Sequence, residues 1–297
     1  MARAATLWNG RLLSWQYGGE PFYFYRRQGP KFVSAKQNSD FPITRFVGLE
    51  IEGSGFGDGA TKADLQNLQK VVKKWNGDIV QDVDYEIRTS PARGEAFIKQ
   101  TLEVCLALSN AKSECDSHCG GHIHIDMRDF KKDDIRNLLL IVSRVEKVMI
   151  RTQPKGRIVG GPWCRPVAGK IPRKTLLPYE KEKTWSPAVR AVQTGGNEMT
   201  WTPWNSAIAD RYNAVNFLAY REHKTVEIRM AKGTHDPTEI IPWASSWCDI
   251  VTAAKRMGVK AAADFPNTLD KLAEVVNTKA MDYLKQRTEE YAGGWTR

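Results

Sequence analysis

The chain has 297 residues, a length that predicts one large domain or two smaller ones. Its residues are 41% hydrophobic and 10% aromatic, a composition that argues against a disordered chain. Its formal net charge of +10 indicates a negatively charged partner: nucleotide phosphates, a nucleic acid or an acidic small molecule. No apolar run approaches the roughly 18 residues of a membrane span, and the first residues lack the apolar core of a secretory signal. We therefore expect a cytoplasmic protein with no membrane partner.

Residues 1–45 are aromatic and basic and contain turn signals, which predicts short strands and loops packed on the core. Beyond them, stretches of alternating polarity predict strands at 45–55, 78–91, 120–127, 212–220 and 224–233. Stretches with a period near 3.6 predict helices at 61–75, 94–111, 132–153 and 236–258, followed by C-terminal helices to about residue 290. Strands and helices alternate unevenly, so we expect an α+β fold with a curved sheet backed by helices.

Residues 154–200 interrupt this order. They are rich in Pro, Gly, Lys and Trp, and nine Lys and Arg residues stand there against three acids. A stretch of this length without regular structure is usually functional or disordered. We interpret it as a basic insertion that forms a lid or binds substrate, and a solvated linker is the alternative.

Four predicted strands carry polar residues on one face and apolar residues on the other, because side chains alternate along a strand. The polar sets are Glu50 with Glu52, Glu86 with Arg88, His122 with His124 and Asp126, and Glu227 with Arg229. Any one strand fits a sheet that turns its polar face to water. Taken together, however, these positions are mostly Glu and His, residue types that ligate metals, whereas solvated strand faces favour Thr, Lys and Ser.

If these strands are neighbours, several carboxylates meet on one sheet face. Two carboxylates about 4 Å apart repel each other by roughly 4 kcal/mol at an effective dielectric constant of 20. Cations between them would relieve this repulsion. Carboxylate oxygens with few thiolates select hard cations, and imidazole shifts the preference from Mg²⁺ toward Mn²⁺.

A zinc site is the alternative for the segment that holds Cys115, His118, Cys119, His122 and His124. Structural zinc sites use two ligand pairs separated by a dozen or more residues, and this segment has no second pair. The five cysteines form no paired framework, which fits free thiols in a reducing compartment. We expect Cys119 to be a small packed residue and not a nucleophile.

These residues, in this order, resemble the putative amidoligase family, which belongs to the carboxylate–amine ligase superfamily with glutamine synthetase and glutamate–cysteine ligase. The resemblance spans roughly residues 45–255 and is carried by four blocks: FVGLEIEG, DYEIRTSPARG, CGGHIHID and RYNAVNFLAYREHKTVEIRMAKGTHDPTEIIPW. Residues 1–45 and 154–200 have no family pattern. The resemblance implies that residues 46–297 form a catalytic domain with the glutamine synthetase-like fold, whose curved, mainly antiparallel sheet has a catalytic concave face. Known family members come from bacteria and phages.

The resemblance also implies a function: an ATP-dependent ligase that joins a carboxylate to an amine through an acyl phosphate, with two or three Mg²⁺ or Mn²⁺ ions. Glu50, His122 and Glu227 would hold the metal that bridges the β- and γ-phosphates of ATP. Glu52 and Glu86 would hold a second metal, nearer the substrate carboxylate. His124 would contact ATP phosphate, Arg229 would neutralise the transferring phosphoryl group, and Arg211 and Asn216 would lie near the nucleotide or substrate.

Two other functions stay open. An ATP-dependent phosphotransferase would use the same fold and release a phosphorylated product. A nucleic-acid-binding protein would account for the charge and for basic residues interleaved with Trp163, Trp185, Trp201 and Trp204. That reading leaves the aligned acids and histidines unexplained, although a ligase whose substrate is a nucleotide or nucleic acid combines the two.

Overall fold

The computed structural model describes residues 4–8, 11–17, 20–23, 29–80, 84–158, 163–171, 192 and 210–295. Most of the basic insertion predicted at 154–200 lies outside these residues, and so do Trp185, Trp201 and Trp204. The lid prediction therefore stays a prediction. None of the helices in the described part of the chain has the length and apolarity needed to cross a membrane.

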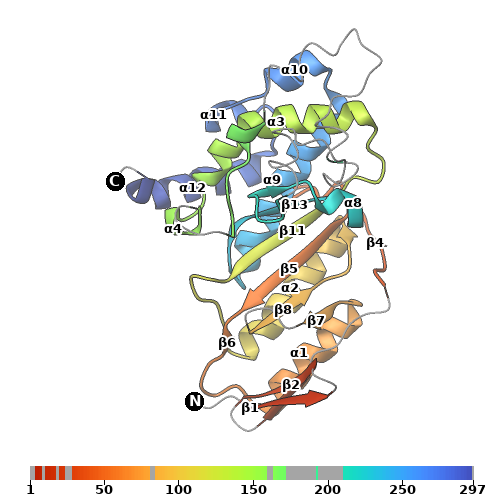
Figure 1. The fold of residues 1–297 in the computed structure, drawn as a ribbon, viewed down its shortest axis with the longest axis vertical. Coiled ribbons are helices and arrows are strands. Elements are labelled where there is room, and N and C mark those ends of the chain that lie inside the picture. The colour runs from red at the N-terminus through yellow and green to blue at the C-terminus, as the bar shows by residue number, and fades with distance from the viewer. Residues whose placement is uncertain are drawn as a thin grey trace.

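An eight-stranded sheet forms the centre of the protein (Figure 1). Its main path runs in the order β12 (Val215–Asn216), β13 (Thr225–Lys232), β11 (Gly120–Asp126), β5 (Val47–Gly53), β8 (Tyr85–Arg88) and β7 (Asp78–Val80). The short strands β4 (Val33–Ser34) and β9 (Ala92–Arg93) complete it, and β4–β9 is the parallel pair. The prediction of an α+β protein with a mainly antiparallel sheet is confirmed.

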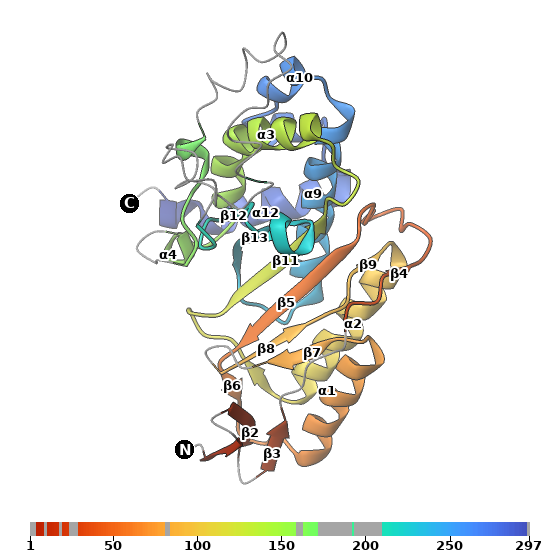
Figure 2. The ribbon, with the colours of Figure 1, turned by 45° about the vertical axis from the view of Figure 1, so that its right-hand side comes forward.

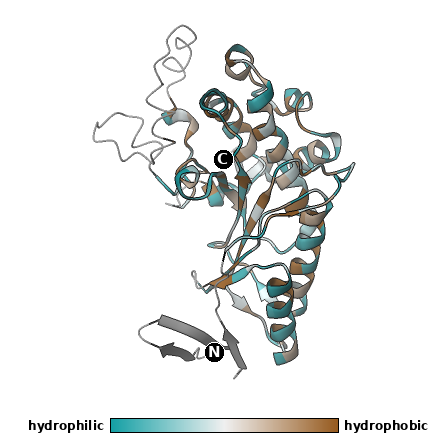
Figure 3. Ribbon diagram, turned by 90° about the vertical axis from the view of Figure 1, so that its right-hand side faces the viewer, coloured by the Kyte–Doolittle hydropathy of each residue, from teal (hydrophilic) through white to brown (hydrophobic). Residues whose placement is uncertain are grey.

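Helices lie against the apolar face of the sheet. They are α1 (Lys62–Lys74), α2 (Glu95–Asn110) and α9 (Pro237–Arg256), as Figures 1 and 2 show. Between the helices and the strands lie the apolar strand residues predicted for that face, all of them buried: Leu49, Ile51, Ile87, Ile123, Ile125, Val226 and Ile228. Figure 3 shows the resulting division, with hydrophilic residues on the outward turns of the helices. The buried face thus leaves the opposite face of each strand for polar residues.

The second helical group packs at the end of the sheet near β13. It comprises α3 (Lys132–Ile150), α10 (Val259–Ala263), α11 (Leu269–Leu272) and α12 (Thr278–Trp295). α3 packs on α9 and α10, and α12 packs on α9. The short helix α4 (Lys155–Ile158) and the 3₁₀ turn η1 (Ala168–Lys170) follow α3 and return the chain toward β13.

The N-terminal strands predicted within residues 1–45 are present. β1 (Ala4–Trp8), β2 (Arg11–Tyr17) and β3 (Glu20–Tyr23) form their own three-stranded antiparallel sheet. It lies near α1 in Figure 1. β4 also precedes residue 46 but pairs with β9 of the central sheet. The domain boundary at residue 45 stays a prediction.

One predicted strand is wrong. Residues 212–220 contain only the two-residue strand β12, and the chain then forms the helix α8 (Ala219–His223). The side-chain oxygen of Asn216 accepts a hydrogen bond from the backbone N–H of Leu218 at 2.9 Å, which turns the chain out of the sheet. The stretch predicted as one strand at 78–91 contains two strands, β7 and β8, which pair with each other.

Candidate functional site

The register of the sheet brings the polar residues of four strands side by side. His122 lies opposite Glu50 in the β11–β5 pair, and His124 lies opposite Glu227 in the β11–β13 pair. Glu52 lies opposite Glu86 in the β5–β8 pair, and Asn216 lies opposite Glu227 in the β12–β13 pair. Because directly opposed side chains point to the same face, all of these groups share one face of the sheet.

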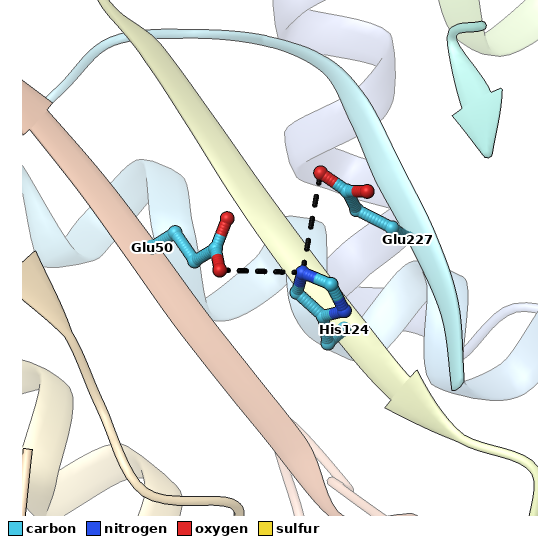
Figure 4. Close-up of side chains that lie close together, drawn as sticks. All are labelled: Glu50, His124 and Glu227. Carbon is cyan, nitrogen blue, oxygen red and sulfur yellow. Dashed lines mark ion pairs between the residues drawn. The ribbon is translucent and has the colours of Figure 1, made fainter. Parts of the chain in front are cut away.

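Glu50, His124 and Glu227 come close enough to hold one metal ion (Figure 4). Each offers a ligand atom within 4.8 Å of the other two. Nε2 of His124 lies 3.4 Å from Oε1 of Glu50 and 3.9 Å from Oε1 of Glu227. The other ring nitrogen, Nδ1, contacts the hydroxyl of Thr225 at 3.0 Å, which orients the ring so that Nε2 faces the carboxylates.

The charges of these groups depend on one another. Burial would lower the pKa of His124, but the carboxylates of Glu50 and Glu227 raise it to about 9. Burial would raise the pKa of Glu50, but His124 and His122 hold it well below its ordinary value of 4.5. A positive charge on the His124 imidazole therefore offsets the negative charges of the two carboxylates. A bound cation would supply the same positive charge.

His122 supplies an independent indication of a cation. Its side chain is 2% exposed, and Nδ1 has no hydrogen-bond partner among the described residues. That nitrogen lies 3.5 Å from Oε2 of Glu50 and 3.8 Å from Oε1 of Glu227. A buried nitrogen without a partner is costly, and a cation between it and the two carboxylates would satisfy all three. Carboxylates with imidazole fit Mg²⁺ or Mn²⁺.

Glu52 and Glu86 lie on the β5–β8 side of the cluster. Glu52 is buried, with Oε1 3.6 Å from Nε2 of His122 and Oε2 accepting the backbone N–H of Gly120 at 2.6 Å. Glu86 is also buried and forms an ion pair with Nε of Arg88. Nε of Arg88 also lies 3.6 Å from Oε1 of Glu50, so this arginine contacts the carboxylates of both Glu86 and Glu50.

The β12–β13 side of the cluster carries the predicted nucleotide contacts. Arg229 forms an ion pair with Oε1 of Glu227, while Asn216 donates its side-chain N–H to Oε2 of Glu227 at 2.6 Å. Nε of Arg229 is buried without a hydrogen-bond partner among the described residues. Arg211, four residues before β12, lines the cavity described next, together with Asn216 and Arg229.

A cavity of about 300 Å³ opens over this face. Eight of the nine predicted site residues line it: Glu50, Glu86, His122, His124, Arg211, Asn216, Glu227 and Arg229. The ninth, Glu52, is not in its wall but contacts His122, with Oε1 3.6 Å from Nε2. A second cavity of about 380 Å³ adjoins it and shares Glu50, Arg88, His124, Glu222 and His223. Pro30, Phe32, Phe46 and Pro91 give this second cavity an apolar wall.

Two arginines in the site were not predicted from the sequence. Arg88 lines both cavities, although the alternation on its strand placed it beside Glu86. Arg157, on α4, donates to the backbone oxygen of Arg229 at 3.2 Å and lies 3.4 Å from Nε2 of His122. No local pattern distinguishes Arg157 from the other basic residues of its segment, so only its packing reveals it.

The zinc alternative is not supported by this geometry. His122 and His124 face the carboxylates, and the side chain of His118 is 74% exposed and lies beside Asp116. Within the described residues, the group of possible metal ligands that lie close together contains no cysteine. His122 and His124 therefore belong to the sheet face, whereas His118 lies outside it.

A cluster of carboxylates and imidazoles that can ligate a cation, set in the wall of a polar cavity, defines a candidate metal centre. The chain belongs to the family described as Putative amidoligase enzyme, whose model matches residues 49–252. The resemblance seen in the sequence blocks is thus confirmed, and the family implies a ligase that forms amide bonds. A search of curated proteins finds no match to the chain.

Proposed function

We propose that the protein is an ATP-dependent ligase that joins a carboxylate to an amine through an acyl phosphate, with two or three Mg²⁺ or Mn²⁺ ions. The family membership supports amide-bond formation. The observation that carries the metal-dependent part is the group of Glu50, His124 and Glu227 on one sheet face, with Nδ1 of His122, which has no hydrogen-bond partner among the described residues, beside it. We also propose that the sheet is curved and that its concave face is the catalytic one.

The proposed roles follow the two sides of the cluster. Glu50, His122 and Glu227 hold the cation at the phosphates, and His124 lies close enough to share in ligating it or to contact phosphate. Glu52 and Glu86, opposite each other in register, hold the second cation nearer the substrate carboxylate. Arg211 and Asn216 lie toward the nucleotide.

The chemistry requires activation, because a carboxylate is a poor electrophile whose leaving group would be oxide. Transfer of the γ-phosphoryl group from ATP makes an acyl phosphate, the amine attacks its carbonyl carbon, and phosphate leaves. The cations, when bound, neutralise charge on the phosphates and on the attacking oxygen. The residues of the chain do the rest by positioning the reactants and neutralising the negative charge that spreads over the transferring group.

Arg229 suits that last task. Its guanidinium is held next to Glu227 by an ion pair, yet its Nε has no hydrogen-bond partner among the described residues. A cation on Glu227 would weaken the ion pair and release Nη1 as well. The guanidinium then presents a fork of N–H donors, the geometry that binds phosphoryl oxygens.

The two adjoining cavities divide the substrates. The 300 Å³ cavity, lined by the acids, the imidazoles and Arg229, suits a triphosphate with its cations. The 380 Å³ cavity, with Phe32 and Phe46 in its wall, suits a substrate that has an apolar portion. Glu50, Arg88 and His124 line both, so we place the reacting groups where the cavities meet.

Release of phosphate from ATP in the presence of Mg²⁺ tests the proposal. The substrates are panels of carboxylic acids and amines, including amino acids, polyamines and modified nucleotides, and products are identified by mass. We expect phosphate release that requires both an acid and an amine, with a product lighter than their sum by one water. Glu50→Gln is the inactive control, and an exposed change, Glu274→Gln, is the matched active one.

Two other outcomes would replace the proposal. Consumption of ATP with a phosphorylated product and no amide identifies a phosphotransferase on the same fold. Salt-sensitive binding of DNA or RNA, with no ATP consumption in any panel, identifies a nucleic-acid-binding protein. The exposed Trp163, whose ring packs edge-on against Tyr212 at 5.1 Å, is the described aromatic residue that such binding would use.

A further inference from the structure

Cys115 and Cys119 are neighbouring thiols at the margin of the metal centre. Cys115 follows the short strand β10 (Ser113–Glu114), and Cys119 directly precedes β11. A turn joins them, in which the backbone N–H of Cys119 donates to the oxygen of Asp116 at 3.3 Å. The two thiols influence each other: a side-chain hydrogen bond between them raises the pKa of Cys115 and lowers the pKa of Cys119. The turn thus brings the two thiols within hydrogen-bonding reach of each other.

These thiols differ from the other three cysteines. Cys105, Cys164 and Cys248 are buried in the core, whereas Cys115 is half-buried and residues 116–118 beside it are exposed. Nε2 of His235 lies 3.0 Å from Sγ of Cys115 and is in position to accept the thiol proton. Solvent access, a base and a second thiol are therefore present at one point.

The turn is also tied to Glu52. Sγ of Cys115 lies 3.4 Å from the backbone oxygen of Glu52, and the N–H of Gly120, the residue after Cys119, donates to Oε2 of Glu52 at 2.6 Å. A Cβ on Gly120 would collide with the guanidinium of Arg157 and lie 2.7 Å from Nε2 of His122. Because the N–H bonded to Glu52 belongs to the peptide group that joins Cys119 to Gly120, a displacement of Cys119 is passed to Glu52 through that one peptide group.

We propose that Cys115 and Cys119 are a modification site, at which reaction with a hydroperoxide forms a disulfide that weakens metal binding at Glu52. The O–O bond of the peroxide breaks and an S–S bond forms. The two sulfurs are oxidised and the peroxide is reduced to an alcohol and water, which take up the two thiol protons. For hydrogen peroxide both products are water. The effect on the metal rests on the proposed function, whereas formation of the disulfide does not.

Geometry gives the reason for the coupling. A disulfide holds its sulfurs at about 2.05 Å with a dihedral angle near 90°, so two hydrogen-bonded thiols must approach and rotate to form one. Cys119 is fixed on its other side, because its backbone oxygen accepts the N–H of Gly233 at 2.9 Å. The required movement therefore alters the N–H of Gly120 and its bond to Glu52. Loss of such a supporting bond lowers metal affinity by about 10–100-fold.

Mass spectrometry tests the disulfide. Trypsin releases residues 113–128 as one peptide that holds both thiols and no other cysteine. The full-length protein is treated with a small excess of hydrogen peroxide, alkylated and digested. We expect this peptide to carry no alkyl group and to be two hydrogens lighter than the peptide with free thiols. Reduction before alkylation should restore both alkyl groups. Cys105→Ser retains this response, and Cys115→Ser abolishes it. Full alkylation of both thiols, or sulfinic acid without a disulfide, overturns the proposal.

Titration with Mn²⁺ tests the coupling. The oxidised protein should bind one ion at least about tenfold more weakly than the reduced protein, and reduction should restore the affinity. Cys115→Ser should bind Mn²⁺ as the reduced protein does, before and after peroxide. Disulfide formation with unchanged Mn²⁺ affinity refutes the coupling alone. If even the reduced protein binds no Mn²⁺, the proposed metal centre fails, and the disulfide is still judged from the peptide.

Discussion

The buried carboxyl of Glu146 makes the stability of the fold depend on pH. Glu146 lies on α3 with no exposed surface, and its oxygens accept the backbone N–H groups of Val167, at 3.0 and 2.9 Å, and of Ala168, at 2.6 Å. Burial raises its pKa from 4.5 to about 7, and the two N–H groups offset only part of that rise. Glu146 thereby anchors the segment in which Arg165 exchanges backbone hydrogen bonds with residues 212–214, next to Arg229.

The sign and size of the effect follow from the raised pKa. Between pH 4.5 and about 7 the folded chain keeps a proton on Glu146 that the unfolded chain releases. The contribution to the free energy of unfolding is therefore fully present below pH 4.5 and is lost as the pH rises through about 7. At about 1.4 kcal/mol per pKa unit the whole loss is about 3–4 kcal/mol, most of which falls between pH 5 and pH 8.

Glu146→Gln removes this titration. We expect the stability of the wild-type chain relative to the variant to fall by about 2–3 kcal/mol from pH 5 to pH 8, measured by urea unfolding at each pH. The difference between the two proteins cancels the other titrating groups. Glu274→Gln, at an exposed position, should show no such trend. A difference for Glu146→Gln that is flat, or that rises with pH, would show that the carboxyl is ionised in the fold and refute the reasoning.

The remaining predictions concern the site. Arg229→Ala should retain ATP binding but less than about a tenth of the wild-type rate; a higher rate would remove Arg229 from phosphoryl transfer. Glu227→Gln should weaken Mn²⁺ binding by at least about tenfold in calorimetric titration, whereas the exposed His118→Asn should not; equal effects would contradict the metal centre. Gly120→Ala should lower the free energy of unfolding by about 1–3 kcal/mol, because its Cβ would lie 2.7 Å from Nε2 of the buried His122. Gly156→Ala, which has open space on α4, should be neutral or stabilising by up to about 1 kcal/mol, and similar losses in both would contradict the packing argument.

Local patterns predicted most of the secondary structure. The helices at 61–75, 94–111, 132–153 and 236–258 are present as α1, α2, α3 and α9 with ends shifted by a few residues. α1 shows why the pattern was readable, since Thr61 and Asp64 form a capping box and Leu65 and Leu68 are buried. Long amphipathic helices and capping residues carry their signal within one segment, so no knowledge of distant contacts is needed.

The errors fall where distant contacts or single side chains decide. Residues 212–220 read as a strand by their alternation, but Asn216 turns the chain after two residues and also donates to Glu227 of the next strand. Arg157 looked like one of many basic residues in an insertion, yet it packs between His122 and the backbone of Arg229. The turn at Asn216 is local, but the alternation of the neighbouring residues outweighed it, whereas Arg157 has no signature within its own segment.

The sequence by itself determined which side chains share a face of each strand, because alternation is a property of the extended backbone and needs no partner. It also determined the residue types available: carboxylates, imidazoles and arginines on four strands. Only the tertiary structure decided that β5, β8, β11 and β13 are neighbours, in a register that sets His122 beside Glu50 and His124 beside Glu227. The order and register of the strands depend on burial of the opposite, apolar face under the helices. This burial involves residues far apart in the chain, so it cannot be read from any one segment.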